Sequence, residues 1–453
     1  MRALHSFPTS DLAATGHELA ERLRSTRRRT VALCEPLSAE DMMVQSCPEA
    51  SPVKWHLAHT AWFFESFVLR EFLPGYRVFH SDFAWLFNSY YQSFTAFPEK
   101  RLRSSFSRPA LEEVLRYRGY VDGALEHLLS RNVHPEALRR IELGVNHEEQ
   151  HQELLLTDIL HAFFTNPLRP AYRAVPQPEE AMAVGCTDAP ALRFVSFEGG
   201  MREAGSAGDR FSFDNEQRRH RIWVEPYALG SRLVTCGEFA SFIADGGYRR
   251  PDLWLSAGWD AVQANGWRAP MYWTESNGRW SVFTLHGEQS FADLKSAPVS
   301  HVSFFEADAY ARWADRRLAT EFEWEAAAEK VPVEGNLLES GRLQPVPVDA
   351  SDPAPDASRR AHSQVLEFPS EVPSGPAQFF GDCWEWTASA YLPYPGFKPL
   401  GGSLGEYNGK FMSGQMVLRG GSCLTPLGHI RASYRNFFPP ETRWQFSGIR
   451  LAS

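Results

Sequence analysis

The stretch Asn146-His147-Glu148-Glu149-Gln150-His151 lies inside a strongly helical run, residues 135–164. An α-helix completes a turn about every 3.6 residues, so the two histidines lie on the same face of the helix, one turn apart. A helix in this way presents two imidazoles to one metal ion. The same stretch also matches the His-Glu-x-x-His pattern of zinc peptidases. It therefore predicts a metal-binding helix and leaves the metal and its chemistry open.

Three further helical segments precede this run, and together they predict a four-helix bundle. Ser51 and Pro52 match a helix N-cap followed by proline at the first helical position. An irregular excursion, 74–108, separates the second segment from the third. Bundles of this kind often build metal sites from side chains that face inward on different helices. The three segments are expected at residues 11–33, 52–73 and 109–130.

The rest of the chain has a different texture, with short apolar runs, such as 194–195 and 221–224, between Gly, Asn and Pro turns. Two helices are expected in it, at residues 303–314 and 321–329. A length of 453 residues suits two or three domains. We therefore predict an α+β protein with a helical bundle over 1–165, a Pro- and Ala-rich linker over 166–190, and a loop-rich α+β domain over 191–453.

Composition excludes several classes of protein. The net charge of −9 argues against a nucleic-acid-binding protein, which needs a basic surface. No apolar run is long enough for a membrane span, so no membrane partner is expected. The six Cys are scattered and form no Cys-x-x-Cys pair, which argues against a zinc ribbon or a disulfide scaffold. A reducing cytoplasm is the expected location.

A third metal ligand is expected from the second helix, which carries His56 and His59. Either one, together with His147 and His151, would supply three neutral nitrogen donors. His161 lies ten residues beyond His151, about 15 Å along the helix, and cannot share the ion. Three histidines leave up to three positions open on a six-coordinate metal such as Fe(II), and those positions would accommodate substrate and O₂ together.

A zinc peptidase is the competing interpretation of the same stretch, with Glu148 as the general base. The extended peptidase signature does not follow His151, and the available downstream acids, Glu179 and Glu180, fall in the predicted linker. A non-enzymatic, lectin-like binding module attached to a structural bundle is a third interpretation.

Two sets of motifs carry a family resemblance. The segment from Ser51-Pro52 to Leu57-Ala58-His59, with His147 to His151, resembles a DinB-like bundle. The later motifs resemble the formylglycine-generating-enzyme (sulfatase-modifying-factor) domain, which has a C-type-lectin-like fold; they are Gly381-Asp382, Trp384-Glu385-Trp386-Thr387, Arg419-Gly420-Gly421-Ser422 and Gly448-Ile449-Arg450. A chain that carries both sets of motifs in this order resembles the hercynine oxygenases, the iron-dependent sulfoxide synthases of ergothioneine biosynthesis.

This resemblance implies Fe(II) held by His59, His147 and His151, with His56 behind the ligands. It implies an O₂-dependent reaction that joins a cysteine sulfur to C2 of the hercynine imidazole and oxidises the sulfur to a sulfoxide. An ovothiol-type synthase, which forms the bond at another imidazole carbon, usually carries an added methyltransferase domain that is not expected here. A copper-dependent formylglycine-generating enzyme needs a second Cys after Cys423, and the sequence contains none.

The resemblance also implies substrate contacts. Hercynine carries a trimethylammonium group, which aromatic faces bind, and a carboxylate. Asn436 matches a family residue suited to the carboxylate, and Phe437 and Phe438 are suited to the cation. Gln150, between the two helical ligands, matches another substrate-contacting position, although packing explains a residue at this place equally well.

A catalytic proton donor is expected from Tyr90 and Tyr91. The mycobacterial type carries its active Tyr after the Trp-Glu-Trp motif, but the comparable stretch here, 399–403, has no Tyr. The pair resembles a second subtype with an N-terminal Tyr pair.

The thiol substrate's carboxylate is expected to pair with Arg101 or Arg103, although a solvated charged run explains these residues equally well. At the positions of the acid and the arginine that hold γ-glutamylcysteine in the mycobacterial type, this chain has Phe438 and Thr442. That favours free cysteine over γ-glutamylcysteine.

Overall fold

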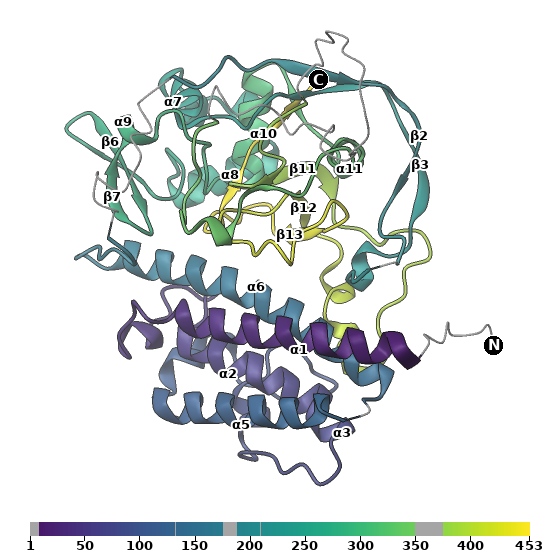
Figure 1. Ribbon diagram of the computed structural model, residues 1–453. Coiled ribbons are helices and arrows are strands. Elements are labelled where there is room, and N and C mark those ends of the chain that lie inside the picture. The colour runs from purple at the N-terminus through teal and green to yellow at the C-terminus, as the bar shows by residue number, and fades with distance from the viewer. Residues whose placement is uncertain (1–8, 132, 175–187, 209, 349–374) are drawn as a thin grey trace, which may run out of the picture. The chain divides into compact units, whose positions relative to one another are not determined.

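Helices dominate the first part of the computed structural model (Figure 1), as predicted. The bundle consists of α1 (Thr9–Ala32), α2 (Val53–Phe64), α5 (Leu111–Leu129) and α6 (Pro135–Thr165). A π-helical turn, η2 (Glu65–Leu69), continues α2 into the short α3 (Arg70–Phe72), and the excursion contains α4 (Phe83–Leu86) and the 3₁₀-helix η3 (Lys100–Ser105). The structure describes residues 9–131, 133–174, 188–208, 210–348 and 375–453. Most of the predicted linker, residues 175–187, lies outside them.

Helix α2 is the central element of the bundle. Every residue from Val53 to Phe64 is buried, because α2 packs against both α5 and α6. The close approach of α6 depends on Gly144, since a Cβ at that position would overlap the ring of Phe64. Burial on all sides explains why eight of the twelve residues of this helix are apolar or aromatic.

The starts of two helices differ from the sequence-based expectation. The N-cap of α2 is Pro52, not Ser51, and the Ser51 hydroxyl instead accepts a hydrogen bond from Arg103 at 2.8 Å. Helix α5 begins at Leu111, two residues after the expected proline. Helix α6 begins as expected: Pro135 occupies the first turn, and the imidazole of His134 caps it by accepting from the backbone N–H of Glu136 at 3.1 Å.

The chain divides into two units, and one segment departs from sequence order. The first unit comprises Met1–Pro167 together with Leu400–Tyr407, and the second comprises Leu168–Pro399 and Asn408–Ser453. Leu400–Tyr407, although late in the sequence, therefore belongs with the helical bundle. None of the helices in the described residues is long and apolar enough to cross a membrane.

The second unit is built from short strands with helices between them. One four-stranded sheet has the order β1–β4–β15–β8 and another has the order β13–β12–β11–β14. The first contains β1 (Phe194–Phe197), β4 (Tyr227–Gly230), β15 (Leu451–Ala452) and β8 (Arg317–Leu318). The second contains β13 (Asn436–Phe438), β12 (Met416–Arg419), β11 (Trp384–Ala390) and β14 (Ser447–Gly448).

Smaller sheets and helices complete this unit. They include both helices expected at residues 303–314 and 321–329, together with three α-helices that the sequence analysis did not predict. The smaller sheets pair β2 (Gly200–Ala204) with β3 (His220–Val224), β5 (Trp273–Ser276) with β6 (Arg279–Thr284) and β7 (Gly287–Ser290), and β9 (Gly335–Asn336) with β10 (Phe380–Gly381). The helices are α7 (Cys236–Ala244), α8 (Ser256–Asn265), α9 (Phe291–Leu294), α10 (Phe304–Trp313) and α11 (Glu321–Ala328).

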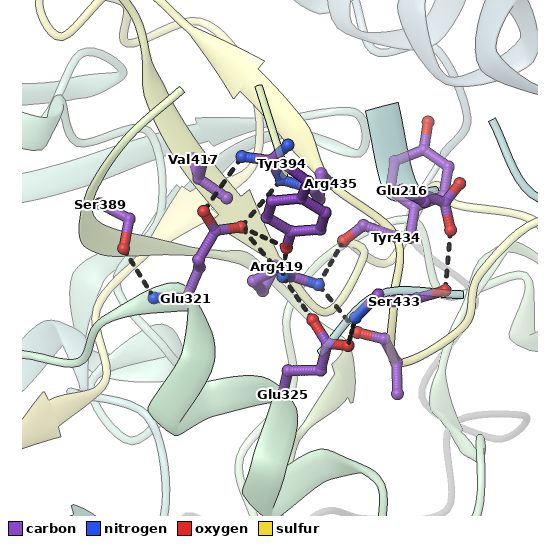
Figure 2. Close-up of polar contacts among 12 residues, drawn as sticks. Glu216, Glu321, Glu325, Ser389, Tyr394, Val417, Arg419, Ser433, Tyr434 and Arg435 are labelled. Atoms are coloured by element: carbon purple, nitrogen blue, oxygen red, sulfur yellow. Dashed lines mark hydrogen bonds and ion pairs between the residues drawn. The ribbon is translucent and has the colours of Figure 1, made fainter. Parts of the chain in front are cut away.

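A buried ion-pair network ties α11 to the sheet of β12 (Figure 2). Arg419 donates to Glu325 at 2.7 Å and to Glu321 at 3.0 Å, and Arg435 donates to both oxygens of Glu321 at 2.8 and 3.0 Å. The hydroxyl of Tyr394 also contacts Glu321 at 3.0 Å. Each buried charge here has an opposite charge and further hydrogen bonds, which buried ions require.

The motifs that carry the resemblance in this unit are therefore largely structural. Arg419 of the Arg-Gly-Gly-Ser motif belongs to the network. Glu385, from the Trp-Glu-Trp motif, accepts two hydrogen bonds from Arg450 at 2.7 and 2.9 Å, and both residues are buried. These motifs identify a fold, and the chemistry must be found elsewhere.

Candidate metal centre

Three imidazoles from two helices of the bundle converge on one point. His59 comes from α2, and His147 and His151 come from successive turns of α6. The Nε2 atom of His147 lies 3.2 Å from Nε2 of His59 and 3.1 Å from Nε2 of His151. All three rings are buried, and their ligand atoms lie within 4.8 Å of one another. The sequence placed two of these on one face, and packing of α2 against α6 brings the third.

The orientation of the rings is that of metal ligands. Nδ1 of His59 lies 2.6 Å from the carbonyl oxygen of Phe87, which can only accept, so Nδ1 carries the proton and Nε2 presents a lone pair. Burial lowers the pKa of His59 and of His151 well below 6.5, and lowers the pKa of His147 to about 3. All three rings are therefore neutral at pH 7, the form that binds metal.

A divalent ion fits this donor set. Two nitrogens bound at roughly 2.1 Å to one ion lie about 3.0 Å apart at a right angle and about 3.4 Å apart at a tetrahedral angle. The measured separations of 3.1 and 3.2 Å fall between these values. The residues thus fit a divalent metal, and the spacing suits Fe(II) and Zn(II) alike.

Glu148, the general base of the peptidase interpretation, is fully buried and engaged away from the three histidines. Its carboxylate accepts hydrogen bonds from Arg27 at 2.7 Å, Thr30 at 2.7 Å and Arg118 at 2.8 Å. Burial raises the pKa of Glu148, but the two guanidinium groups outweigh it and lower the pKa to about 2. A carboxylate clamped in this way is unavailable to activate water, which argues against the zinc peptidase. Its complete burial also excludes a surface position for Glu148.

The predicted tyrosine pair lies near this cluster, together with a third tyrosine that sequence reasoning missed. The rings of Tyr90 and Tyr91 are 4.7 Å apart, and Tyr407 lies 6.3 Å from Tyr90 and 5.6 Å from His147. The Tyr91 hydroxyl is buried without a hydrogen-bond partner among the described residues. Burial, with the hydroxyls of Tyr90 and Tyr407 nearby, raises the pKa of Tyr91 well above 10.

Tyr407 belongs to the segment that joins the bundle. Its hydroxyl donates to Gln150, which lies between His147 and His151 on α6. The neighbouring Glu406 accepts from the backbone N–H groups of Gln92 at 3.1 Å and Ser93 at 2.9 Å, which anchors the segment beside the tyrosine pair. The only available sequence signal was a Tyr four residues beyond the 399–403 stretch that lacks one.

The two candidate arginines differ in their surroundings. Arg101 is exposed and pairs with Glu99 at 2.6 Å. Arg103 is buried: its guanidinium lies 3.5 Å over the ring of Trp55 and donates to the hydroxyls of Ser51 and Ser89 at 2.8 and 3.2 Å. No carboxylate among the described residues pairs with Arg103, and burial lowers its pKa to about 9.

The three C-terminal candidates form β13 in the second unit, and each is partly exposed. Phe437 stacks on Tyr391 with ring centroids 4.0 Å apart, so one of its faces is covered. The side-chain oxygen of Asn436 accepts from the backbone N–H of Phe437 at 2.9 Å. Phe438 lies 6.1 Å from Trp444.

Comparison with known proteins agrees with this architecture. Residues 22–155 match the DinB superfamily, and residues 182–453 match the sulfatase-modifying factor enzyme 1-like domain. A hercynine oxygenase from Mycobacterium tuberculosis is 33% identical over 448 residues, covering 96% of this chain and 98% of that protein. The chain belongs to the hercynine oxygenase family. It is therefore an enzyme, an oxygenase, and not a non-enzymatic lectin-like module.

Some relatives match the whole chain, and others match only part of it. A second hercynine oxygenase, from Mycolicibacterium smegmatis, is 32% identical over 447 residues, and the alignment covers 96% of this chain and 98% of that protein. A formylglycine-generating enzyme from Streptomyces coelicolor is 28% identical over 326 residues, which is 62% of this chain. The hercynine oxygenases thus match the bundle and the second unit together.

Proposed function

We propose that this enzyme uses Fe(II) and O₂ to join the sulfur of cysteine to C2 of the hercynine imidazole, giving the hercynyl-cysteine sulfoxide of ergothioneine biosynthesis. The observation that carries the proposal is the convergence of three neutral imidazole nitrogens in an oxygenase family. His59, His147 and His151 would hold the iron. When bound, Fe(II) supplies electrons for O₂ and open coordination positions for substrates.

Tyr90 and Tyr91 are the proposed proton donors. A buried tyrosine with a raised pKa keeps its proton at neutral pH and is a neutral donor. The Tyr91 hydroxyl is buried next to Tyr90, so the two phenols together form one candidate source of the proton. Tyr407, beside His147 and bonded to Gln150, is positioned to assist the same pair.

Arg103 or Arg101 is proposed to bind the α-carboxylate of the thiol substrate, and the surroundings favour Arg103. No carboxylate among the described residues forms an ion pair with its buried guanidinium, so a substrate carboxylate that reaches it would be a favourable partner. Arg103 also lines a crevice with Trp55 and Phe87, close to the ligand His59. Phe438 and Thr442 lack the charge that would hold a second carboxylate, which supports free cysteine over γ-glutamylcysteine.

Gln150, Asn436, Phe437 and Phe438 are the proposed hercynine contacts. Aromatic faces attract a trimethylammonium group, and a side-chain amide donates to a carboxylate. Phe437 has one ring face against Tyr391, so its other face is the one proposed for the cation.

The decisive experiment loads the protein anaerobically with Fe(II), hercynine and cysteine and then admits air. O₂ consumption with a sulfoxide product attached at C2, identified by mass spectrometry and NMR, is the expected result. Zn(II)-loaded protein is the matched control and should form no product. The absence of O₂ consumption with hercynine and cysteine would overturn the proposal. Attachment of the sulfur at another imidazole carbon would overturn it in favour of an ovothiol-type reaction.

Two substitutions test the residue assignments. Tyr90→Phe with Tyr91→Phe should change the rate or the ratio of products, and an unchanged enzyme would refute the assignment. Arg103→Gln should raise KM for cysteine more than Arg101→Gln does, because only Arg103 is buried and lacks a carboxylate. Equal effects on KM would contradict the preference for Arg103, and no effect of either substitution would refute both assignments.

A further inference from the structure

A chain of hydrogen bonds leads away from one of the three proposed ligands. Nδ1 of His151 lies 2.8 Å from Nδ1 of His56, and Nε2 of His56 lies 3.0 Å from Oδ2 of Asp158. The same carboxylate oxygen accepts from the backbone N–H of Ser51 at 2.8 Å. All these groups are buried, and they come from the start of α2 and from α6.

The direction of these hydrogen bonds follows from their chemistry. The Asp158 carboxylate is an acceptor, so Nε2 of His56 donates to it. When Nδ1 of His56 in turn accepts, the hydrogen bond between the two Nδ1 atoms carries the proton of His151. Nε2 of His151 then carries the lone pair that faces His59 and His147.

We propose that Asp158 and His56 are positioning residues that hold His151 in its metal-binding tautomer and orientation. Outer carboxylates that act in this way on a ligating histidine also raise its basicity and strengthen metal binding. Here a second imidazole lies between the carboxylate and the ligand. The inference rests on the metal site proposed above.

The three proposed ligands differ in the hydrogen-bond partner of their Nδ1 atoms. His59 donates to the neutral carbonyl of Phe87, and Nδ1 of His147 has no partner among the described residues. Within the part of the chain that the structure describes, His151 alone of the three is connected to a carboxylate, through His56. A generic packing network would have no reason to join this carboxylate to one ligand through an imidazole in a defined tautomer. His151 should therefore be the ligand that depends most on its surroundings.

Three substitutions separate geometry from charge. Asparagine at position 158 can keep an oxygen for both Ser51 and His56 while removing the negative charge. Asparagine at position 56 can place its amide oxygen where Nδ1 lies, so it retains an acceptor for His151, whereas leucine cannot. His161→Leu is the matched control, because this buried histidine of α6 hydrogen-bonds Ser46 and lies ten residues beyond His151 in the sequence.

The readout is Co(II) binding by the full-length protein, measured by absorption titration without substrates. His56→Leu is expected to weaken binding 10–100-fold, the usual cost of losing such an outer partner, and Asp158→Asn about 10-fold. His56→Asn should restore most of the affinity, and His161→Leu should leave it unchanged. In the Co(II) protein, the shifted N–H proton of His151 should exchange with water faster in His56→Leu and Asp158→Asn than in the wild type.

The outcomes are distinct from those of the proposed function. Equal Co(II) affinity and equal N–H exchange in the wild type, His56→Leu and Asp158→Asn would overturn the inference while leaving the metal site intact. A wild-type protein that binds no divalent ion would instead refute the metal site. If His56→Leu fails to fold, Asp158→Asn, with an unchanged circular dichroism spectrum, still decides the question through both measurements.

Discussion

Replacing Glu148 with glutamine is expected to destabilise the helical bundle by about 3–5 kcal/mol while leaving the metal site able to bind an ion. The carboxylate is completely buried, and its oxygens accept three hydrogen bonds of 2.7, 2.7 and 2.8 Å. Two of the three donors, Arg27 and Arg118, are cations with side chains only 5% and 3% exposed. Glutamine has nearly the same shape, so the substitution removes charge with little change of volume.

The magnitude follows from what the two arginines retain. Arg27 keeps Asp122 at 2.7 Å, but Arg118 keeps only neutral acceptors, the carbonyl of Leu57 and the hydroxyl of Thr60. A buried guanidinium without a counter-charge is the situation for which losses of about 3–5 kcal/mol are typical. The amide of glutamine also brings an N–H donor toward one of the two guanidinium donors in either orientation, which adds to the cost.

Urea unfolding of the metal-free protein, followed by circular dichroism, measures the effect. Urea is uncharged and does not screen the ion pairs, and the absence of metal removes stabilisation by binding. Glu136→Gln is the matched control on the same helix. Glu136 also pairs with two arginines, Arg139 and Arg140, but it is 39% exposed, so its loss should cost below about 1 kcal/mol.

Two results would refute this reasoning. A loss for Glu148→Gln no larger than that for Glu136→Gln would mean that burial of the two arginines carries no penalty. A variant of unchanged stability that binds metal normally but loses all activity would make Glu148 a general base, contrary to its position in the structure.

Three more substitutions test other parts of the molecule. Gly144→Ala should lower bundle stability by about 1–3 kcal/mol in urea unfolding, because its Cβ overlaps a ring of α2; equal stability would show that the helices separate freely. Burial raises the pKa of Asp382 to about 6, above its unfolded value, so the stabilisation from this group is complete below about pH 4 and is lost as the pH rises to about 6. Asp382→Asn should therefore remove about 2–3 kcal/mol of the pH dependence of the unfolding free energy between pH 4 and 7. Identical profiles of unfolding free energy against pH in the variant and the wild type would contradict this prediction. Arg419→Met should cost about 3–5 kcal/mol, since it leaves the two buried carboxylates of α11 without this partner, and a loss under about 1 kcal/mol in thermal or urea unfolding would argue against that account.

Local patterns in the sequence predicted the four bundle helices and two of the five described α-helices of the second unit. Those six helices occur where periodicity and caps indicated, because such signals act over a few residues, whereas α7, α8 and α9 were not predicted. The exact starts were less predictable: Ser51 matches an N-cap by type, yet its hydroxyl bonds Arg103, a residue 52 positions away. The Ser51 hydroxyl thus bonds a distant side chain, Arg103, and not the backbone N–H groups at the start of α2.

The pairing of His147 with His151 was determined by the sequence alone, because a four-residue spacing on an α-helix is a local geometric fact. The remaining features depend on chain segments that only folding brings together. Packing of α2 against α6 selects His59 as the third nitrogen and places His56 behind His151, and burial against α1 and α5 makes Glu148 a structural anion. Tyr407 reaches its place beside His147 because its segment joins the bundle from more than 250 residues away, a distance over which local propensity carries no information.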